Sequence, residues 1–199
     1  GSDSNSHKKY SLSGMDEIIP KFTRAPSVLD VGCNKGFFCH KFSERTSGSI
    51  LGIDTNTESI KDANSLNFSI FKNPNVKFEN VDFFNFKCRK KYDIVFCAST
   101  FHYFRNNQSS FINKVWSDIL AEGGVLVLEA ELYPNNDVPE IKHRSRSVDK
   151  TPCSFPNEKY LENMITGKFL IEATNKSCFQ KGSYYDRHFF VMRKLNYEK

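Results

Sequence analysis

An apolar run of strand length ends in a glycine-bearing turn within residues 28–38, VLDVGCNKGFF. Gly32 and Gly36 allow the backbone to turn tightly and to approach a ligand where a Cβ atom would collide. Asp30 lies two residues before the first glycine. Asp54 ends the next apolar run, 54 − 32 = 22 residues beyond that glycine, close to the ~20 expected of an acid that binds ribose hydroxyls. This pattern indicates a nucleotide-cofactor site.

A second group of residues could act on whatever that site presents. His102 and Tyr103 follow the expected fourth strand, residues 92–97, at its carboxyl end. Open α/β sheets bind their ligands at this edge, which makes both residues candidates for the active site. Packing in the core is the alternative for each, because aromatic rings are large apolar groups that fill cores.

The elements that must position these residues alternate between strand-like and helix-like stretches. The expected strands are residues 28–32, 49–54, 76–79, 92–97, 125–129, 169–173 and 187–193, and the expected helices are 36–46, 57–66, 107–121 and 156–165, with a turn at Gly123-Gly124. Such alternation requires parallel strands joined by right-handed crossovers. The last two runs follow a loop at 133–155 and a helix, with no helix between them. The expected fold is α/β, a doubly wound, mostly parallel seven-stranded sheet with an antiparallel C-terminal edge hairpin.

Length and composition predict one soluble intracellular domain. The chain has 199 residues, of which 39% are hydrophobic and 26% charged, and no apolar stretch approaches the ~20 residues of a membrane span. Residues 1–9 read as a flexible N-terminal segment without a signal peptide, and residues 10–199 as one domain. Six cysteines without paired spacing favour free thiols, a cytoplasmic or nuclear location and no metal. A monomer is favoured, and the net charge of +5 permits a polyanionic partner without requiring one.

The glycine turn departs from the dinucleotide fingerprint, because G-x-G-x-x-G is absent. Its acid-x-Gly-x-x-x-Gly form resembles motif I of the class I S-adenosylmethionine methyltransferases. That resemblance favours a methyl donor over NAD, and it implies a Rossmann-like fold with S-adenosyl-L-methionine as the cofactor. Within this class the chain resembles the methylphosphate capping enzyme family, also called bicoid-interacting methyltransferases, which methylate terminal phosphates of RNA. The likeness lies in LDVGCNxG at 29–36, GID at 52–54, YDIVFCxS at 92–99, GGVLVLE at 123–129 and DRxFxxxRK at 186–194.

The resemblance implies roles for the cofactor residues. Asp30 would meet the ammonium of the donor, through the loop or a water, and Asp54 would hold the ribose hydroxyls by charge-assisted hydrogen bonds. Asp82 would face the adenine amino group, with Phe83 over the ring; a solvated turn aspartate is the alternative for Asp82. The whole expected cofactor set is Tyr10, Asp30, Gly32, Cys33, Asn34, Gly36, Asp54, Thr55, Asp82, Phe83, Ala98 and Ser99.

The sequence departs from the capping enzymes where the acceptor should bind. The family's KWVHLN stretch is replaced by FHYFRN at 101–106, and its LEPQPW by LEAELY at 128–133. The N-terminal tyrosine-rich signature is reduced to Lys8-Lys9-Tyr10. The extra carboxylate of Glu131 would repel a phosphate unless it is neutralised. Bacterial methyltransferases that act on a terminal phosphate of a glycan share several of the same features.

The acceptor therefore stays open between two chemistries. A phosphate oxygen is already anionic, so it needs cationic partners rather than a base, and the available clamp is His102, Arg144, Arg146 and Arg187. A hydroxyl needs a base within hydrogen-bond reach, a role for His102 or Glu129. The expected catalytic residues are His102, Tyr103, Glu129 and Arg187, and the expected substrate-binding residues are Arg144, Arg146, Glu131 and Tyr133. The basic residues at 142–146 fit either a phosphate contact or a solvated loop.

Three functions follow from these observations. The first is an S-adenosylmethionine-dependent O-methyltransferase of a phosphate-bearing acceptor, above all an RNA 5′ end. The second is methyl transfer to a small metabolite or a saccharide, including a glycan phosphate. The third is a catalytically silent protein that uses the cofactor fold to bind a partner. The intact set of Asp30, Gly32, Gly36 and Asp54 argues against the third.

Overall fold

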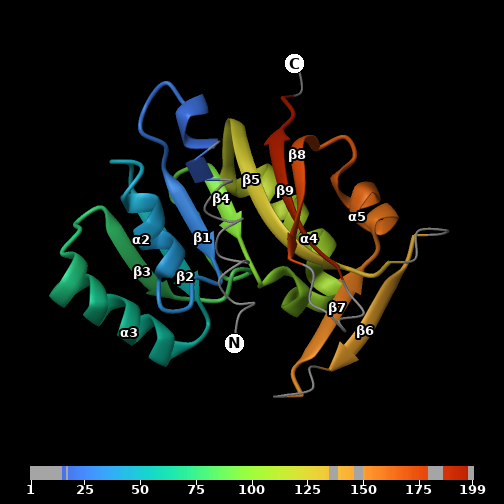
Figure 1. Cartoon of the computed structure of the whole chain (residues 1–199), viewed down its shortest axis with the longest axis horizontal. Coiled ribbons are helices and arrows are strands. Elements are labelled where there is room, and N and C mark those ends of the chain that lie inside the picture. Colours follow the sequence, from blue (N-terminus) through green and yellow to red (C-terminus); the bar gives the residue numbers. More distant parts are fainter. Residues whose placement is uncertain (1–14, 17, 135–138, 146–149, 179–185, 197–199) are drawn as a thin grey trace.

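Seven apolar runs of the chain pair into one sheet in the order β3-β2-β1-β4-β5-β9-β8 (Figure 1). The computed structural model describes residues 15–16, 18–134, 139–145, 150–178 and 186–196. The strands are β1 (Val28–Val31), β2 (Ile50–Asp54), β3 (Val76–Asn80), β4 (Tyr92–Cys97), β5 (Leu120–Leu132), β8 (Phe169–Cys178) and β9 (Asp186–Lys194). The first five run parallel, whereas β9 is antiparallel to both of its neighbours. The expected fold is confirmed.

Helices cover both faces of this sheet, which explains why its strands are nearly continuous apolar runs. They are α2 (Phe37–Ser43), α3 (Thr57–Leu66), α4 (Gln108–Lys114) and α5 (Glu158–Ile165). One face buries Val28 together with Phe42 of α2. The other buries Leu29 together with Phe111 of α4 and Leu161 of α5. Neighbouring residues of β1 thus contribute to opposite cores, as the two-residue period of a strand requires.

Asparagine side chains fix the starts of two helices. The side chain of Asn56 accepts a hydrogen bond from the Ser59 N–H at 2.9 Å, and Asn157 accepts one from the Tyr160 N–H at 2.8 Å. Such caps satisfy backbone donors that have no partner inside the helix. Because Asn56 lies just beyond β2, the cap also fixes where α3 begins relative to the carboxyl edge of the sheet.

The loop expected at residues 133–155 is wrong, because this region contains two further strands. They are β6 (Ile141–Ser145) and β7 (Pro152–Pro156), which pair antiparallel as a separate small sheet. Strand β7 lies against the 3₁₀-helix η3 (Phe101–Asn107) that follows β4. Figure 1 shows this small sheet beside the carboxyl end of the large one.

A buried glutamine holds the small sheet against η3. The side-chain amide of Gln108 donates to the backbone carbonyl of Phe101 at 3.2 Å and to that of Ser154, on β7, at 2.9 Å. Both Gln108 and Ser154 are buried. Since buried polar groups need partners, this bridge explains why β7 stays in contact with η3.

Strand β5 begins earlier than expected and contains the glycine pair predicted to be a turn. The expected helix at 107–121 is divided into α4 and a π-helix at Val115–Ile119. The pairing of β5 with β4 shifts from Tyr92–Leu120 to Ile94–Val125, which leaves an irregular stretch around the two glycines. Gly123 has φ of +67°, a left-handed conformation that absorbs the irregularity within the strand.

No helix in the described part of the chain combines the length and the apolar character needed to cross a membrane.

Candidate functional site

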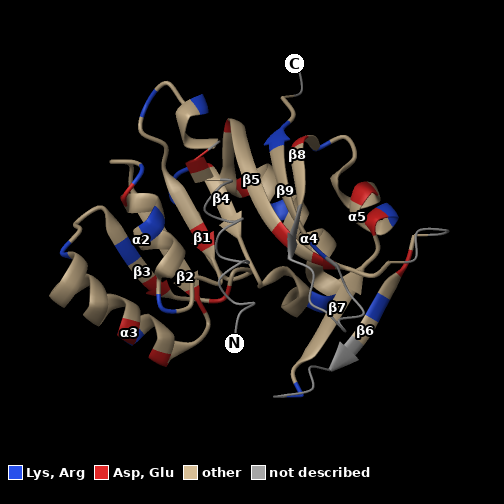
Figure 2. Ribbon diagram, viewed as in Figure 1, with Lys and Arg blue, Asp and Glu red and all other residues tan. Residues whose placement is uncertain are grey.

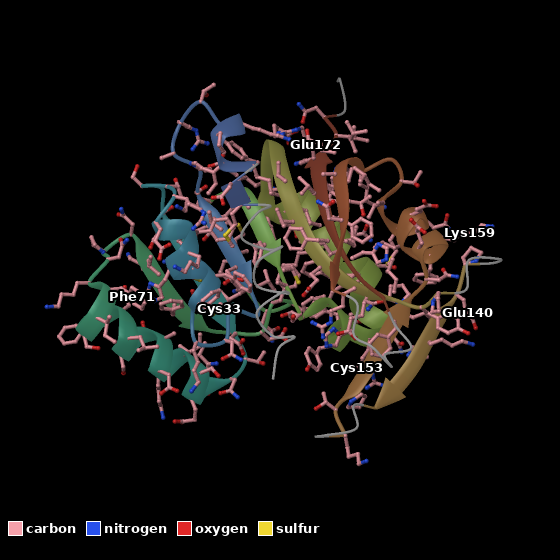
Figure 3. The ribbon with its side chains drawn as sticks, viewed as in Figure 1. Cys33, Phe71, Glu140, Cys153, Lys159 and Glu172 are labelled. Atoms are coloured by element: carbon pink, nitrogen blue, oxygen red, sulfur yellow. The ribbon has the colours of Figure 1, made fainter. Side chains whose placement is uncertain are left out.

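The turn after β1 is so closely surrounded that neither of its glycines has room for a side chain. Gly32 and Gly36 have φ of +77° and +80°. A Cβ atom on Gly32 would lie 2.1 Å from Oγ1 of Thr100, and one on Gly36 would lie 2.4 Å from the ring of Phe78. Glycine is therefore required at both positions, for conformation and for space. The turn leads into α2; its Cys33, labelled in Figure 3, is buried, whereas Asn34 and Lys35 are exposed.

Asp54, at the carboxyl end of β2, ties this turn to the neighbouring strand. One of its carboxylate oxygens accepts a hydrogen bond from the Asn34 N–H at 2.9 Å, and the other accepts one from the Asn56 N–H at 2.8 Å. Asn34 has φ of +50°, a conformation that asparagine tolerates better than most residues. The half-buried carboxylate is thus held in place beside the glycine turn, and its binding of a ribose stays a prediction. Thr55 follows it and is exposed.

Asp30 lies beneath the turn with its side chain buried in the sheet. The Cys39 thiol donates to its carboxylate at 3.2 Å. Burial raises the pKa of Asp30 to about 7, the Cys39 hydrogen bond opposes the rise, and the nearby charge of Asp54 adds to it. Burial also raises the pKa of the Cys39 thiol well above its ordinary value, so this thiol stays protonated. Figure 2 shows acidic positions on β1 and β5, in a sheet that is otherwise mostly uncharged.

Asp82 and Phe83 follow β3 at the same edge of the sheet. The Asp82 carboxylate accepts a hydrogen bond from the Phe84 N–H at 2.8 Å, which shapes the turn. Phe83 is buried, with its ring 4.7 Å from that of Phe111 and with the Lys114 ammonium 5.4 Å from its centroid. The structure assigns this ring to the core. Its expected place over an adenine stays a prediction.

Glu129 of β5 and Ser99, just beyond β4, are in contact at the carboxyl ends of these two strands. Both the backbone N–H and the hydroxyl of Ser99 donate to Oε2 of Glu129, each at 2.8 Å. The Glu129 side chain is 1% exposed, and Ser99 has φ of +53°. Ala98, which precedes Ser99, is buried. The two side chains that the sequence placed in different roles therefore form one unit.

Arg187 of β9 joins this unit to a second carboxylate. One guanidinium nitrogen donates to the Ser99 hydroxyl at 3.2 Å and lies 3.9 Å from Glu129. The other nitrogen pairs with Glu131. This arrangement follows from register, because Glu131 and Arg187 lie opposite each other on β5 and β9. Glu131, which would repel an anion, is thus partly neutralised by the chain itself.

His102 lies buried in a group of aromatic rings on η3 and β7. Its ring lies 4.2 Å from that of Tyr103 and stacks on Phe155 of β7 at 5.9 Å and 15°. Its Nδ1 atom is 4.0 Å from a carboxylate oxygen of Glu131. The structure thus brings His102, Glu131, Arg187 and Glu129 together at one end of the sheet. These four residues are called the acceptor set, and this end of the sheet the acceptor end.

The remaining predicted residues are less closely involved or lie outside the described part. Tyr133 follows β5 and is half-buried, with the Lys142 ammonium of β6 5.1 Å from its ring centroid. The backbone of Arg144 lies on β6 opposite Cys153, but its side chain is outside the described part. Tyr10 and Arg146 also lie outside the described residues.

Sequence reasoning missed Thr100 and Phe155. Thr100 packs against the first glycine of the turn, and its hydroxyl donates to the Ala98 carbonyl at 3.0 Å. Nothing in the local pattern distinguishes it from an ordinary turn residue. Phe155 belongs to the unexpected small sheet, and no local pattern of the sequence indicated its contact with His102. Across the described residues, no group of three or more His, Cys, Asp or Glu side chains is placed to hold a metal ion.

Comparisons with known proteins agree with this fold. The methyltransferase domain family matches residues 23–171. A putative S-adenosylmethionine-dependent methyltransferase from Listeria monocytogenes has a TM-score of 0.73 at 15% identity, over 97% of this chain and 100% of that one. The N-terminal domain of EvdMO1, solved with S-adenosylhomocysteine bound, has a TM-score of 0.73 at 14% identity, over 98% of this chain and 82% of that one. Identities this low show the fold alone.

Two curated relatives come from Ilyobacter polytropus. Malonyl-[acyl-carrier protein] O-methyltransferase 1 is 26% identical over 178 residues, covering 85% of this chain and 59% of the relative. Malonyl-[acyl-carrier protein] O-methyltransferase 2 is 23% identical over 141 residues, covering 70% of this chain and 49% of the relative. The chain therefore spans only about half to three fifths of the length of these relatives.

The strand order and the glycine turn define the class as an S-adenosylmethionine-dependent methyltransferase fold. The chain belongs to the methyltransferase domain family. Its cofactor is accordingly S-adenosylmethionine. The narrower resemblance to the capping enzymes remains a hypothesis, because the match is to the methyltransferase domain in general and the two curated relatives are named for another acceptor.

The contacts of Asp54 lead to a first prediction. Replacing it by alanine, Asp54→Ala, should weaken the binding of S-adenosylhomocysteine by roughly 1.5–3 kcal/mol, since charged hydrogen bonds to the ribose are lost. The variant also removes the acceptor that holds the Asn34 N–H. Calorimetric titration measures the loss. Asp54→Asn, which keeps an acceptor oxygen but no charge, should lose less, and wild-type affinity in Asp54→Ala would show that this residue is misassigned.

Proposed function

We propose that this chain is an O-methyltransferase that acts on the hydroxyl oxygen of a small acceptor. The observation that carries the proposal is the charge at the acceptor end. Among the side chains that the structure describes there, the two carboxylates of Glu129 and Glu131 both lie against the guanidinium of Arg187. A phosphate would meet this excess of negative charge, whereas a neutral hydroxyl would not. The two curated relatives are named O-methyltransferases, which supports an oxygen atom as the methyl acceptor.

The cofactor residues fit a ligand that carries a cation. When bound, S-adenosylmethionine supplies an electrophilic methyl group on a sulfonium, from which a neutral thioether leaves. The backbone from Gly32 to Gly36 and the Asp54 carboxylate would hold it at the glycine turn. The carboxyl of Asp30 suits its ammonium, because an opposite charge offsets the cost of burying a carboxylate.

The residues at the acceptor end then have defined tasks. His102 would take the proton that the acceptor hydroxyl loses when its oxygen receives the methyl group. Glu131, 4.0 Å from its Nδ1 atom, stabilises the imidazolium that results. Tyr103 and Phe155 exclude water around the ring, which keeps the proton transfer directed. Alignment of the acceptor oxygen with the methyl carbon contributes the rest of the rate.

A labelled-methyl assay tests the proposal. The protein is incubated with methyl-labelled donor and a panel of hydroxyl-bearing metabolites, saccharides and acyl carrier proteins, next to 5′-phosphorylated and dephosphorylated RNA. Transfer to a hydroxyl-bearing small molecule supports the proposal. Transfer confined to the 5′-phosphorylated RNA contradicts it.

An RNA 5′-terminal phosphate is the second candidate, and basic residues at the same end favour it. Arg187 reaches the acceptor set, and β6 carries Lys142 and the exposed His143 beside it. The net charge of the chain is +5. Under this alternative, methylation requires the 5′-phosphate and falls steeply as salt rises, because phosphate contacts release counterions. The same RNA pair, assayed over a range of salt concentrations, separates the two candidates.

A further inference from the structure

The turn between β4 and η3 is held in a costly conformation by hydrogen bonds to a buried carboxylate, that of Glu129. Ser99 is left-handed, with φ of +53°, a region that residues other than glycine rarely adopt. Its N–H and its hydroxyl both donate to the same oxygen of Glu129, each at 2.8 Å. Charge-assisted hydrogen bonds are stronger than neutral ones, so this pair offsets the strain.

The conformation of Ser99 also affects the glycine turn after β1. Ser99 is followed by Thr100, whose side chain lies so close to Gly32 that a Cβ atom there would be 2.1 Å from Oγ1. The position of Thr100 therefore defines one wall of the turn that holds the methyl donor. A change in the backbone at Ser99 would move that wall.

The same conformation sets the start of the segment that carries His102. Helix η3 begins at Phe101, two residues after Ser99. A second left-handed residue, Arg105 with φ of +51°, lies further along the same helix. Two strained positions thus flank His102, and Glu129 fixes the first of them.

We propose that Glu129 is a positioning residue that holds Ser99 left-handed and thereby fixes both the Thr100 wall of the donor site and the start of η3. This positioning role replaces the role of general base that the sequence allowed for Glu129. The side chain is 1% exposed, and the oxygen that bonds Ser99 also lies 3.9 Å from Arg187. A carboxylate engaged in this way orients its neighbours. His102 is left as the base of the proposed reaction, on which this inference partly rests.

The test uses the affinity for S-adenosylhomocysteine, measured by calorimetry on the full chain. Glu129→Gln preserves shape but weakens both bonds to Ser99, and it should lower this affinity about tenfold. Ser99→Gly in the same background should restore it to within about threefold of wild type, because glycine adopts the left-handed conformation without help. Glu122→Gln, an exposed acid on the same strand, is the matched control and should keep wild-type affinity.

A second pair of variants needs no change at Glu129. Ser99→Ala keeps the N–H bond but retains the strain and loses the hydroxyl, whereas Ser99→Gly loses the same hydroxyl and relieves the strain. The proposal expects the glycine variant to bind S-adenosylhomocysteine several-fold more tightly than the alanine variant. This comparison decides the question if Glu129→Gln fails to fold.

Three results would overturn the proposal. They are wild-type affinity in Glu129→Gln, absence of rescue by Ser99→Gly, and equal affinity of the alanine and glycine variants. A Glu129→Gln protein that binds S-adenosylhomocysteine normally but loses turnover would instead make Glu129 a catalytic residue. Binding of this thioether needs no acceptor, so failure of the small-hydroxyl proposal would leave the outcome of these titrations unchanged.

Discussion

Replacing Asp30 by asparagine should make the protein more stable above pH 7 and weaken its binding of the methyl donor. The pKa of this buried carboxyl rises from 3.8 to about 7, mainly because burial disfavours its charged form. Between these values the folded protein keeps a proton that the unfolded chain loses. Stability therefore falls as pH rises through this window, by about 4 kcal/mol in all. Asp30→Asn cannot ionise and should escape this loss.

Chemical denaturation between pH 4 and pH 8 measures the effect. Wild type and Asp30→Asn should be similar near pH 4 and diverge by several kcal/mol near pH 8. Asp93→Asn is the matched control with the opposite sign. Burial alone would raise the pKa of Asp93, but hydrogen bonds from Ser27 and the charge of Arg24 outweigh it and lower that pKa. Its ionised form therefore stabilises the fold, and Asp93→Asn should be less stable than wild type at neutral pH.

Donor binding should show the functional side of the same carboxyl. In the wild type, the affinity for S-adenosylmethionine should rise with pH through about 7, because Asp30 must be ionised to receive the ammonium. Asp30→Asn should bind more weakly and show no such rise. Parallel pH slopes in the two proteins, or lower stability of the variant at pH 8, would contradict the assignment.

The glycine turn and the position of Asp54 beside it could be predicted because their determinants are local. A continuous apolar run predicts a strand buried on both faces of a parallel sheet, and glycines after it predict a turn; the structure shows both, with positive φ at the glycines. The spacing from Gly32 to Asp54 corresponds to one strand–helix–strand unit, made of β1, α2 and β2. The pairing of β8 with β9 could be anticipated because no helix separates them. In each case the sequence carries the signal within a few tens of residues.

The acceptor half could not be predicted in the same way, because it depends on long-range register. Glu129, Ser99 and Arg187 lie on or just beyond three different strands, and only the pairing of β4, β5 and β9 brings them together. Strand β7 begins and ends with a proline, a residue that usually demotes a strand to a loop. The ring of Phe155 against His102 was invisible for this reason.

Loss of the His102 imidazole should lower kcat by about 10²- to 10⁴-fold if the acceptor is a hydroxyl, which is the contribution typical of a positioned general base. His102→Ala removes the group, and His102→Gln keeps part of its volume beside Phe155. Both variants should bind S-adenosylhomocysteine with nearly wild-type affinity, since the ring contacts η3, β7 and Glu131 rather than the glycine turn. Single-turnover assays with the acceptor found in the labelled-methyl experiment measure the rate.

The size of the loss distinguishes the two acceptor chemistries. A phosphate oxygen is anionic near neutral pH and needs no base, so an RNA-end methyltransferase should lose less than about tenfold on the same substitution. His40→Ala is the matched control, because His40 is 4% exposed and His102 6% exposed, and His40 lies on α2 away from the acceptor set. It should lower stability without slowing the folded enzyme. A large rate loss in His102→Ala alone, with donor affinity intact, therefore identifies the imidazole as the proton acceptor.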